Sequence, residues 1–211
     1  APPKINLNTI MQFVSRPSWC LNMMTAKKLN FGNIMGHVTN VTNLSSLASW
    51  TADQFDPTLT WEDIAWIKDR WKGKLILKGI MDSEDALLAV KAGADAIIIS
   101  NHGGRQLDGA PSTISVLPEI VDAVNSKAEV HFDGGVRSGQ DVLKALALGA
   151  DCIHIGRPYV YGLGAKGQEG VEIAIEIIEK ELDLTMAMCG ETNISNVGLH
   201  NLHRNPFKII N

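Results

Sequence analysis

The chain has 211 residues, of which 45% are hydrophobic and 20% are charged, and its formal net charge is −4. This composition is typical of a soluble globular protein with one sizeable core, and it excludes disordered and fibrous proteins. No run of 18 or more apolar residues is present, and the first residues lack the basic start and apolar stretch of a signal peptide. We therefore expect neither a membrane-spanning helix nor a secretory leader.

The three cysteines, Cys20, Cys152 and Cys189, are too few and too scattered for a disulfide framework or a zinc site. We therefore expect no metal site and a reducing compartment, the cytoplasm, and we expect no nucleic-acid partner. The chain begins with alanine rather than methionine, so we also expect it to start at a processing or cleavage point.

Residues 1–52 differ in charge from the rest of the chain, because they contain four basic residues and no Asp or Glu: Lys4, Arg16, Lys27 and Lys28. Aromatic side chains are interleaved with these bases. Such a segment can contact a membrane surface or a partner protein, so peripheral contact with the inner face of the membrane is possible. The plainer interpretation is a helix packed on the body of the protein. We expect one domain over residues 1–52 and a second over residues 53–211.

The second domain alternates helix and strand patterns. A helix near 61–71 begins after Thr60, and Asp63 stands three residues later as in a capping box. The predicted strands cover residues 74–80, 95–101, 129–134 and 151–156. The predicted helices between and after them cover residues 83–92, 112–126, 138–148 and 168–182.

An internal repeat explains this alternation. Residues 77–100, "LKGIMDSEDALLAVKAGADAIIIS", align at a constant offset with residues 133–156, "DGGVRSGQDVLKALALGADCIHIG". A fixed period indicates a duplicated unit, and each copy has the pattern of a strand, a helix and a strand. Continuous apolar runs are typical of strands buried on both faces, and helical crossovers make such strands parallel. The fold class is therefore α/β.

Two α/β architectures fit this pattern, an open doubly wound sheet and a closed (β/α)8 barrel. Chemically reactive residues follow four successive strand ends, whereas an open sheet concentrates them at one crevice. This distribution favours the barrel, but a barrel needs eight βα units and about 250 residues. We therefore expect the C-terminal half, four βα units, of a (β/α)8 barrel.

Two loops are typical of a phosphate site. "FDGGVRSGQD", residues 132–141, places two glycines and Arg137 between a strand and a helix, so that backbone amides, the helix N-terminus and a guanidinium can meet an anion. "IGRP" supplies Gly156 and Arg157 one unit later. Adjacent loops after the last two strands are the usual phosphate site of this barrel.

Three further side chains follow strand ends. Lys78 either points into the barrel mouth toward an electron-rich ligand or pairs with an internal carboxylate. In "SNHGGR", Arg105 can hold a carboxylate through two parallel hydrogen bonds, and His102 can accept a proton from a neighbouring substrate atom. A strand-end histidine by itself is more often structural, but the neighbouring arginine and phosphate loops favour catalysis.

Four motifs in order, "LILKGI", "SNHGGRQLDG", "HFDGGVRSGQDVLKALALGAD" and "IGRP", resemble the FMN-dependent α-hydroxy acid dehydrogenase and oxidase family. The family includes L-lactate dehydrogenases, glycolate oxidases and mandelate dehydrogenases. The resemblance runs from about Phe55 to about Gly190, and residues 1–50 resemble the variable segment after the fourth strand. It implies a (β/α)8 barrel, an FMN cofactor and a small L-2-hydroxy acid substrate, with L-lactate favoured.

The resemblance also assigns roles to individual residues. His102 would be the catalytic base, removing either the hydroxyl proton or the α-proton, and Arg105 would bind the substrate carboxylate. Lys78 would stabilise negative charge on the reduced flavin, and Ser100 would contact the flavin. The residues that would hold the ribityl chain and phosphate are Asp133, Gly134, Gly135, Val136, Arg137, Gly156 and Arg157.

The first four βα units of the family pattern have no counterpart in this sequence. We therefore expect a partner, the N-terminal half-barrel as a separate chain, and a homo-oligomer of complete barrels. The alternative is a non-catalytic fragment that binds a phosphate ligand or a partner through its basic N-terminal segment. Another phosphate-binding (β/α)8 enzyme is a third possibility, but it leaves the spacing of His102 and Arg105 unexplained.

Overall fold

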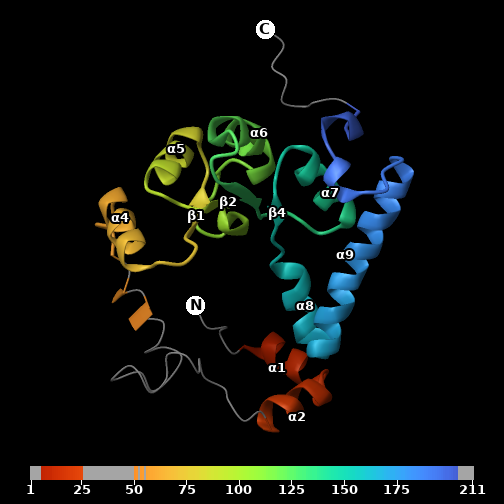
Figure 1. Ribbon diagram of the computed structural model, residues 1–211. Helices are drawn as coiled ribbons and strands as arrows, with labels where there is room; N and C mark the ends of the chain where they lie inside the picture. Colours follow the sequence, from red (N-terminus) through yellow and green to blue (C-terminus); the bar gives the residue numbers. More distant parts are fainter. Residues whose placement is uncertain (1–5, 26–49, 52, 55, 204–211) are drawn as a thin grey trace. The chain divides into compact units, whose positions relative to one another are not determined.

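The structure, a computed structural model, describes residues 6–25, 50–51, 53–54 and 56–203 (Figure 1). The chain forms two compact units, residues 1–59 and residues 60–211, each described here by itself. The charge pattern predicted a boundary after residue 52, a little before the one that the structure has. Of the bases that define the N-terminal segment, Lys4, Lys27 and Lys28 lie outside the described residues.

Residues 6–25 of the first unit form a hairpin of two short helices in contact with each other. Helix α1 (Leu7–Val14) begins after Asn6, whose side chain caps it, and helix α2 (Pro17–Thr25) begins at a proline, a residue that suits the first helical turn. The rings of Phe13 and Trp19 stack with centroids 5.5 Å apart. Most other apolar side chains of the hairpin are exposed, including Leu7, Val14 and Met24.

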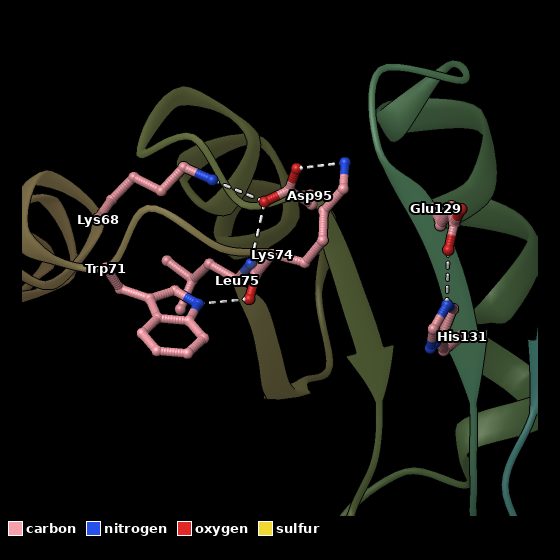
Figure 2. Close-up of polar contacts among 7 residues, drawn as sticks. All are labelled: Lys68, Trp71, Lys74, Leu75, Asp95, Glu129 and His131. Carbon is pink, nitrogen blue, oxygen red and sulfur yellow. Dashed lines mark hydrogen bonds and ion pairs between the residues drawn. The ribbon is translucent and has the colours of Figure 1, made fainter.

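The second unit opens with helix α4 (Trp61–Arg70). The predicted capping box is confirmed, because the Asp63 carboxylate accepts the backbone amide of Thr60 at 2.7 Å and its hydroxyl at 3.0 Å. The helix ends one residue before the predicted Trp71, whose indole nitrogen instead donates to the Lys74 carbonyl at 2.9 Å (Figure 2).

A four-stranded parallel sheet follows, with its strands side by side in chain order. The strands are β1 (Ile76–Ile80), β2 (Ala96–Ile99), β3 (Glu129–Phe132) and β4 (Cys152–Ile153). The prediction of parallel strands is confirmed. Each strand is shorter than predicted: β1 starts two residues later, whereas β2, β3 and β4 end earlier, where polar residues turn into the loops that form the candidate site.

Three helices connect the strands and lie on one side of the sheet (Figure 1): α5 (Ser83–Lys91), α6 (Thr113–Val124) and α7 (Gly139–Ala147). The core lies between these helices and the sheet, and its largest fully buried side chains are Ile97, Ile99, Leu117, Ile120 and Val124. A doubly wound sheet has helices on both faces, whereas these three helices lie on one side of a parallel α/β sheet.

Two further helices complete the unit, α8 (Arg157–Lys166) and α9 (Gln168–Met188), and α9 runs beyond its predicted end at residue 182. Helix α9 packs against both α7 and α8. Glycines make the contacts close: a Cβ on Gly139 would overlap the backbone of Leu182, and a Cβ on Gly170 would overlap that of Gly162. The short 3-10 turns are η1 (His102–Gly104), η2 (Ile194–Asn196) and η3 (Leu199–Asn201).

The register shows which side chains share the face opposite these helices. Ile98 pairs with His131, and His131 pairs with Cys152. Since side chains alternate along a strand, Lys78, Asp133 and His154 lie on this same face. The face therefore carries polar and ionisable groups, whereas the helix-covered face is apolar.

Candidate active site

A cavity of about 350 Å³ lies at the carboxyl ends of the four strands. This volume is within the range of small-molecule sites. Ten of the predicted site residues line it: Lys78, His102, Arg105, Asp133, Gly134, Gly135, Val136, Arg137, Gly156 and Arg157. Ser100 does not line it. Five residues not predicted from the sequence also line the cavity: Gly103, His154, Ile155, Pro158 and Tyr159.

Lys78 both faces the cavity and pairs with a carboxylate, so the two alternatives left open by its sequence position occur together. Its ammonium group donates to the Ser100 hydroxyl at 2.7 Å and forms an ion pair with Asp133. Gly79, with a φ of 102°, lies at a β-bulge directly after Lys78. A bulge at a strand end re-aims the neighbouring side chain, and glycine adopts its positive φ without strain.

Ser100 links Lys78 to the loop that carries His102. It is only 4% exposed, and its hydroxyl oxygen accepts the Lys78 ammonium and also the His102 backbone amide, the latter at 3.2 Å. A hydroxyl oxygen has two acceptor lone pairs, so these two hydrogen bonds leave the hydroxyl proton unused.

The η1 turn presents His102 in an uncommon conformation. His102, Gly103 and Gly104 have φ values of 55°, 68° and 72°. A left-handed residue other than glycine costs roughly 1–2 kcal/mol, so this conformation persists only where the surroundings impose it. The Asn101 side chain supplies part of that support, because it accepts the Gly104 amide at 3.2 Å and donates to the Pro111 carbonyl.

His102 and Arg105 both have exposed side chains that face the cavity. Among the described residues, none hydrogen-bonds to the imidazole of His102 or to the guanidinium of Arg105. A base and a bidentate anion donor therefore lie beside one cavity without an internal partner in the described part of the chain.

The glycine loop leaves open space where a ligand would lie. Gly134 and Gly135 have φ values of 96° and 84°. No atom lies within 4 Å of the position that a Cβ would take on Gly135 or on Gly156. Gly134 is different, since a Cβ there would lie 2.9 Å from the hydroxyl oxygen of Thr113. That hydroxyl donates to the Gly134 carbonyl and so holds the loop in place.

Two carboxylates of the protein lie at the N-terminus of α7, where the sequence pattern predicts anion binding. The Asp141 carboxylate accepts the amides of Arg137 and Ser138 at 3.0 and 3.1 Å, and Glu181 of α9 accepts the amide of Gly139 at 2.9 Å. Carboxylates of the protein therefore already accept three backbone amides around the start of α7, and the anion site expected at this helix N-terminus stays a prediction.

The N-terminus of α8 also borders the cavity and can attract an anion. Its N-cap residue, Gly156, has no side chain to cap the helix, and Arg157, Pro158 and Tyr159 of its first turn line the cavity. Arg157 lies across the site, with a guanidinium nitrogen 3.5 Å from the Gly103 carbonyl oxygen. Helix N-termini attract anions, so the positive end of α8 and the guanidinium of Arg157 act at the same edge of the cavity.

His154 follows β4 and borders the cavity beside Asp133. Burial, together with the neighbouring His131, lowers the pKa of its imidazole, which favours the neutral ring. The sequence analysis missed His154 because it stands inside an apolar strand pattern, "DCIHIG", and only its strand-end position could have indicated a role.

The model of the FMN-dependent dehydrogenase family matches residues 1–204 of the chain. An L-lactate dehydrogenase of Vibrio cholerae serotype O1 (strain M66-2) is 41% identical over 201 residues, which is 95% of this chain and 53% of that protein. The chain thus spans about half the length of the curated relatives that it matches.

Solved structures give the same similarity. The monotopic membrane protein (S)-mandelate dehydrogenase superposes with a TM-score of 0.85 at 34% identity, covering 93% of this chain and 52% of that one. A mandelate oxidase variant with a monooxide FMN adduct gives a TM-score of 0.64 at 46% identity, covering 67% of this chain and 45% of that one.

Proposed function

Because this chain belongs to the FMN-dependent dehydrogenase family, we propose that it carries the cofactor and catalytic loops of an enzyme that oxidises an L-2-hydroxy acid to the 2-oxo acid. The observation that carries the proposal is the single cavity edge at which His102, Arg105 and Lys78 meet the two arginine-bearing loops. L-lactate is the substrate that we favour, since the curated relatives are L-lactate dehydrogenases.

The four strands fit one sector of a (β/α)8 barrel. Their order follows the chain, and the connecting helices lie on one side, as in a barrel wall. The polar face of the sheet would then point to the barrel interior. Activity requires four further βα units, supplied by a second polypeptide or by more of the same protein, and intact-mass analysis of the active enzyme distinguishes the two.

The residues at the cavity fit an FMN cofactor. The open space above Gly135 and Gly156, the N-terminus of α8 and the cations of Arg137 and Arg157 suit the phosphate. Lys78 suits the electron-rich edge of the ring system, and Asp133 and Val136 suit the ribityl chain. When bound, FMN supplies the redox chemistry by accepting the two electrons removed from the substrate.

The protein's own groups supply binding and proton transfer. Arg105 holds the substrate carboxylate through paired hydrogen bonds, which orient the substrate toward His102. His102 accepts a proton from the substrate, either from the hydroxyl oxygen or from the α-carbon. Asp133 and Ser100 hold the Lys78 ammonium in place, so its positive charge is fixed before negative charge develops nearby.

Replacing His102 by Ala tests the base in the assembled enzyme. Turnover should fall roughly 10²-fold or more while flavin content stays unchanged, because general-base catalysis is typically worth 10²–10⁴. Flavin absorbance per chain and steady-state turnover with L-lactate give the two measurements. Near-normal turnover in the variant would remove His102 from this role.

Arg105→Lys and Arg137→Ala form a matched pair that separates substrate from cofactor. A lysine cannot reproduce the bidentate fork, so Arg105→Lys should weaken substrate saturation and leave flavin content intact. Arg137→Ala should lower flavin content first, with activity restored by excess FMN. The opposite pattern, with flavin lost in Arg105→Lys and substrate affinity lost in Arg137→Ala, would reverse the two assignments.

The rival proposal is a non-catalytic fragment that binds a phosphate ligand or a partner. It shares the glycine and arginine loops but gives no role to His102 or Arg105, which lie together at the same cavity. A flavin spectrum of the purified protein discriminates between them, since the rival predicts none.

We further propose that the first unit contacts a membrane surface peripherally. None of the described helices has the length and hydrophobicity that crossing a bilayer needs. The α1–α2 hairpin nevertheless exposes Leu7, Val14 and Met24, with Arg16 between its helices. An apolar face beside a base suits the interface of an anionic bilayer. Co-flotation with vesicles containing phosphatidylserine should fall on Leu7→Glu, and flotation unchanged by that substitution would contradict the proposal.

A further inference from the structure

Three metal-ligating side chains meet on the polar face of the sheet, below the cavity. The strand register places His131 beside Cys152, and His154 lies two residues further along on the same face. Their donor atoms all lie within 4.8 Å of one another. Nδ1 of His131 and Nε2 of His154 are 3.1 Å apart.

We propose that His131, Cys152 and His154 form a transition-metal site, for which Zn²⁺ is the best-fitting ion. Zinc–nitrogen bonds of about 2.0–2.1 Å in a tetrahedral site place two ligand nitrogens about 3.3 Å apart. The two imidazole nitrogens are already close to that separation. Two imidazoles and a thiolate are ligands that zinc prefers, and the fourth position is left for water or another ligand.

Glu129 is a second, independent observation that supports the site. Its carboxylate points toward Nε2 of His131 (Figure 2), and the two atoms are 3.0 Å apart. A carboxylate accepts, so Nε2 carries the proton, and the neutral ring then has its lone pair on Nδ1, the atom that faces His154. A carboxylate that orients a histidine in this way is the usual outer partner of a zinc ligand.

The protein's frame does not require these residues. In the first copy of the repeat, Ala96 and Ile98 occupy the positions that Cys152 and His154 occupy in the second. The two copies form equivalent strands, β2 and β4, of one sheet. Apolar side chains at these positions therefore suffice for the fold. His131 is only 7% exposed, and placing an imidazole there is costly unless it has partners.

Metal binding has a defined proton balance. Without the ion, His154 donates the proton on its Nε2 to the lone pair of His131. With the ion, His154 carries its proton on Nδ1, and the Cys152 thiol releases one proton to solvent as its sulfur becomes a thiolate ligand. This proposal is independent of the proposed oxidation, and it differs from our expectation from sequence, which considered the cysteines alone.

The test is metal binding by the purified, metal-stripped protein. We expect about one Co²⁺ per chain, a thiolate-to-cobalt charge-transfer band in the difference spectrum, and displacement of the band by Zn²⁺. Cys152→Ser should abolish the band with little change in side-chain volume, and His154→Ala should weaken binding. Glu129→Gln should weaken binding roughly 10–100-fold, the usual effect of losing an outer partner.

Cys189→Ser and His200→Ala are the matched controls. Cys189 is an exposed free thiol, and His200 is a histidine paired with Glu191, so neither belongs to the cluster. Both variants should bind Co²⁺ like the parent protein. The proposal is overturned if Co²⁺ does not bind stoichiometrically, or if the band survives Cys152→Ser and disappears with Cys189→Ser. Flavin content, measured separately, decides the proposed function.

Discussion

Residues 77–100 and residues 133–156 are two copies of one strand–helix–strand unit, and they differ mainly at one end. Both helices have a side-chain N-cap at the same place, Asp82 in the first copy and Ser138 in the second. Both end before a glycine with positive φ, Gly93 and Gly149. The frame of the repeat is therefore preserved in detail.

The aspartates of the repeated "GAD" also make equivalent hydrogen bonds. Asp95 donates its amide to the Leu75 carbonyl at 2.8 Å and accepts the Leu75 amide at 2.9 Å (Figure 2). Asp151 exchanges the same two bonds with Val130, at 2.8 and 2.7 Å. Each aspartate therefore ties its strand to the preceding one at the amino end of the sheet.

The carboxyl ends carry the difference. The first copy supplies Lys78, with Ser100 at its second strand end, whereas the second supplies Asp133 and, at its second strand end, Gly156. In both copies, hydrogen bonds at the amino ends of the strands stabilise the sheet. The residues at the carboxyl ends can therefore differ in chemistry without loss of the fold.

The largest expected difference between the copies concerns the glycines that end their helices. A Cβ on Gly149 would lie 2.8 Å from Cγ1 of Val121, whereas a Cβ on Gly93 would lie 3.6 Å from the nearest atom. Gly149→Ala should therefore cost about 2–4 kcal/mol, and Gly93→Ala about 1–2 kcal/mol from backbone strain alone. Urea unfolding of both variants measures the difference, and equal losses would show that packing at Val121 is not limiting.

A smaller difference concerns the aspartates in the first helical turns. Asp141→Asn should cost about 1–2 kcal/mol, because its carboxylate accepts two backbone amides. Asp85→Asn should be close to neutral at pH 7, since burial and the neighbouring Asp82 raise the pKa of Asp85 and its charge therefore opposes folding. Asp85 contributes stability at pH values below its unfolded pKa, and this is lost as pH rises through the folded pKa. A destabilised Asp85→Asn protein at pH 7 would contradict this sign.

The smallest expected difference is a pH effect at the aspartates of "GAD". Hydrogen bonds from Lys68, the Leu75 amide and Lys74 hold the pKa of Asp95 well below its usual range. Its contribution is fully present above the unfolded pKa, about 3.9, and is lost as pH falls toward the folded value. Asp95→Asn should therefore unfold with a shallower acid dependence below pH 4 than the parent. Acid titration followed by circular dichroism checks this, and an unchanged slope would argue against the ion pairs.

Local patterns were enough to predict five of the described helices and the parallel strands, and the family resemblance supplied most of the cavity residues. The capping of α4 followed from Thr60 and Asp63, and the repeat revealed the βα order. Long-range contacts were not predictable in this way. Glu181, which caps α7 from another helix, and His131, which meets His154 only through strand register, lie far from their partners in sequence.

The different N-termini of α7 and α8 have a consequence for the buffers in which this protein is handled. Carboxylates of the protein already accept three amides around the start of α7, so dissolved phosphate or sulfate would have to displace them to bind there. The first turn of α8 borders the cavity and, in the described structure, has no side-chain cap. Inorganic anions would therefore compete with the proposed cofactor at one place, and flavin retention would depend on the choice of buffer salt.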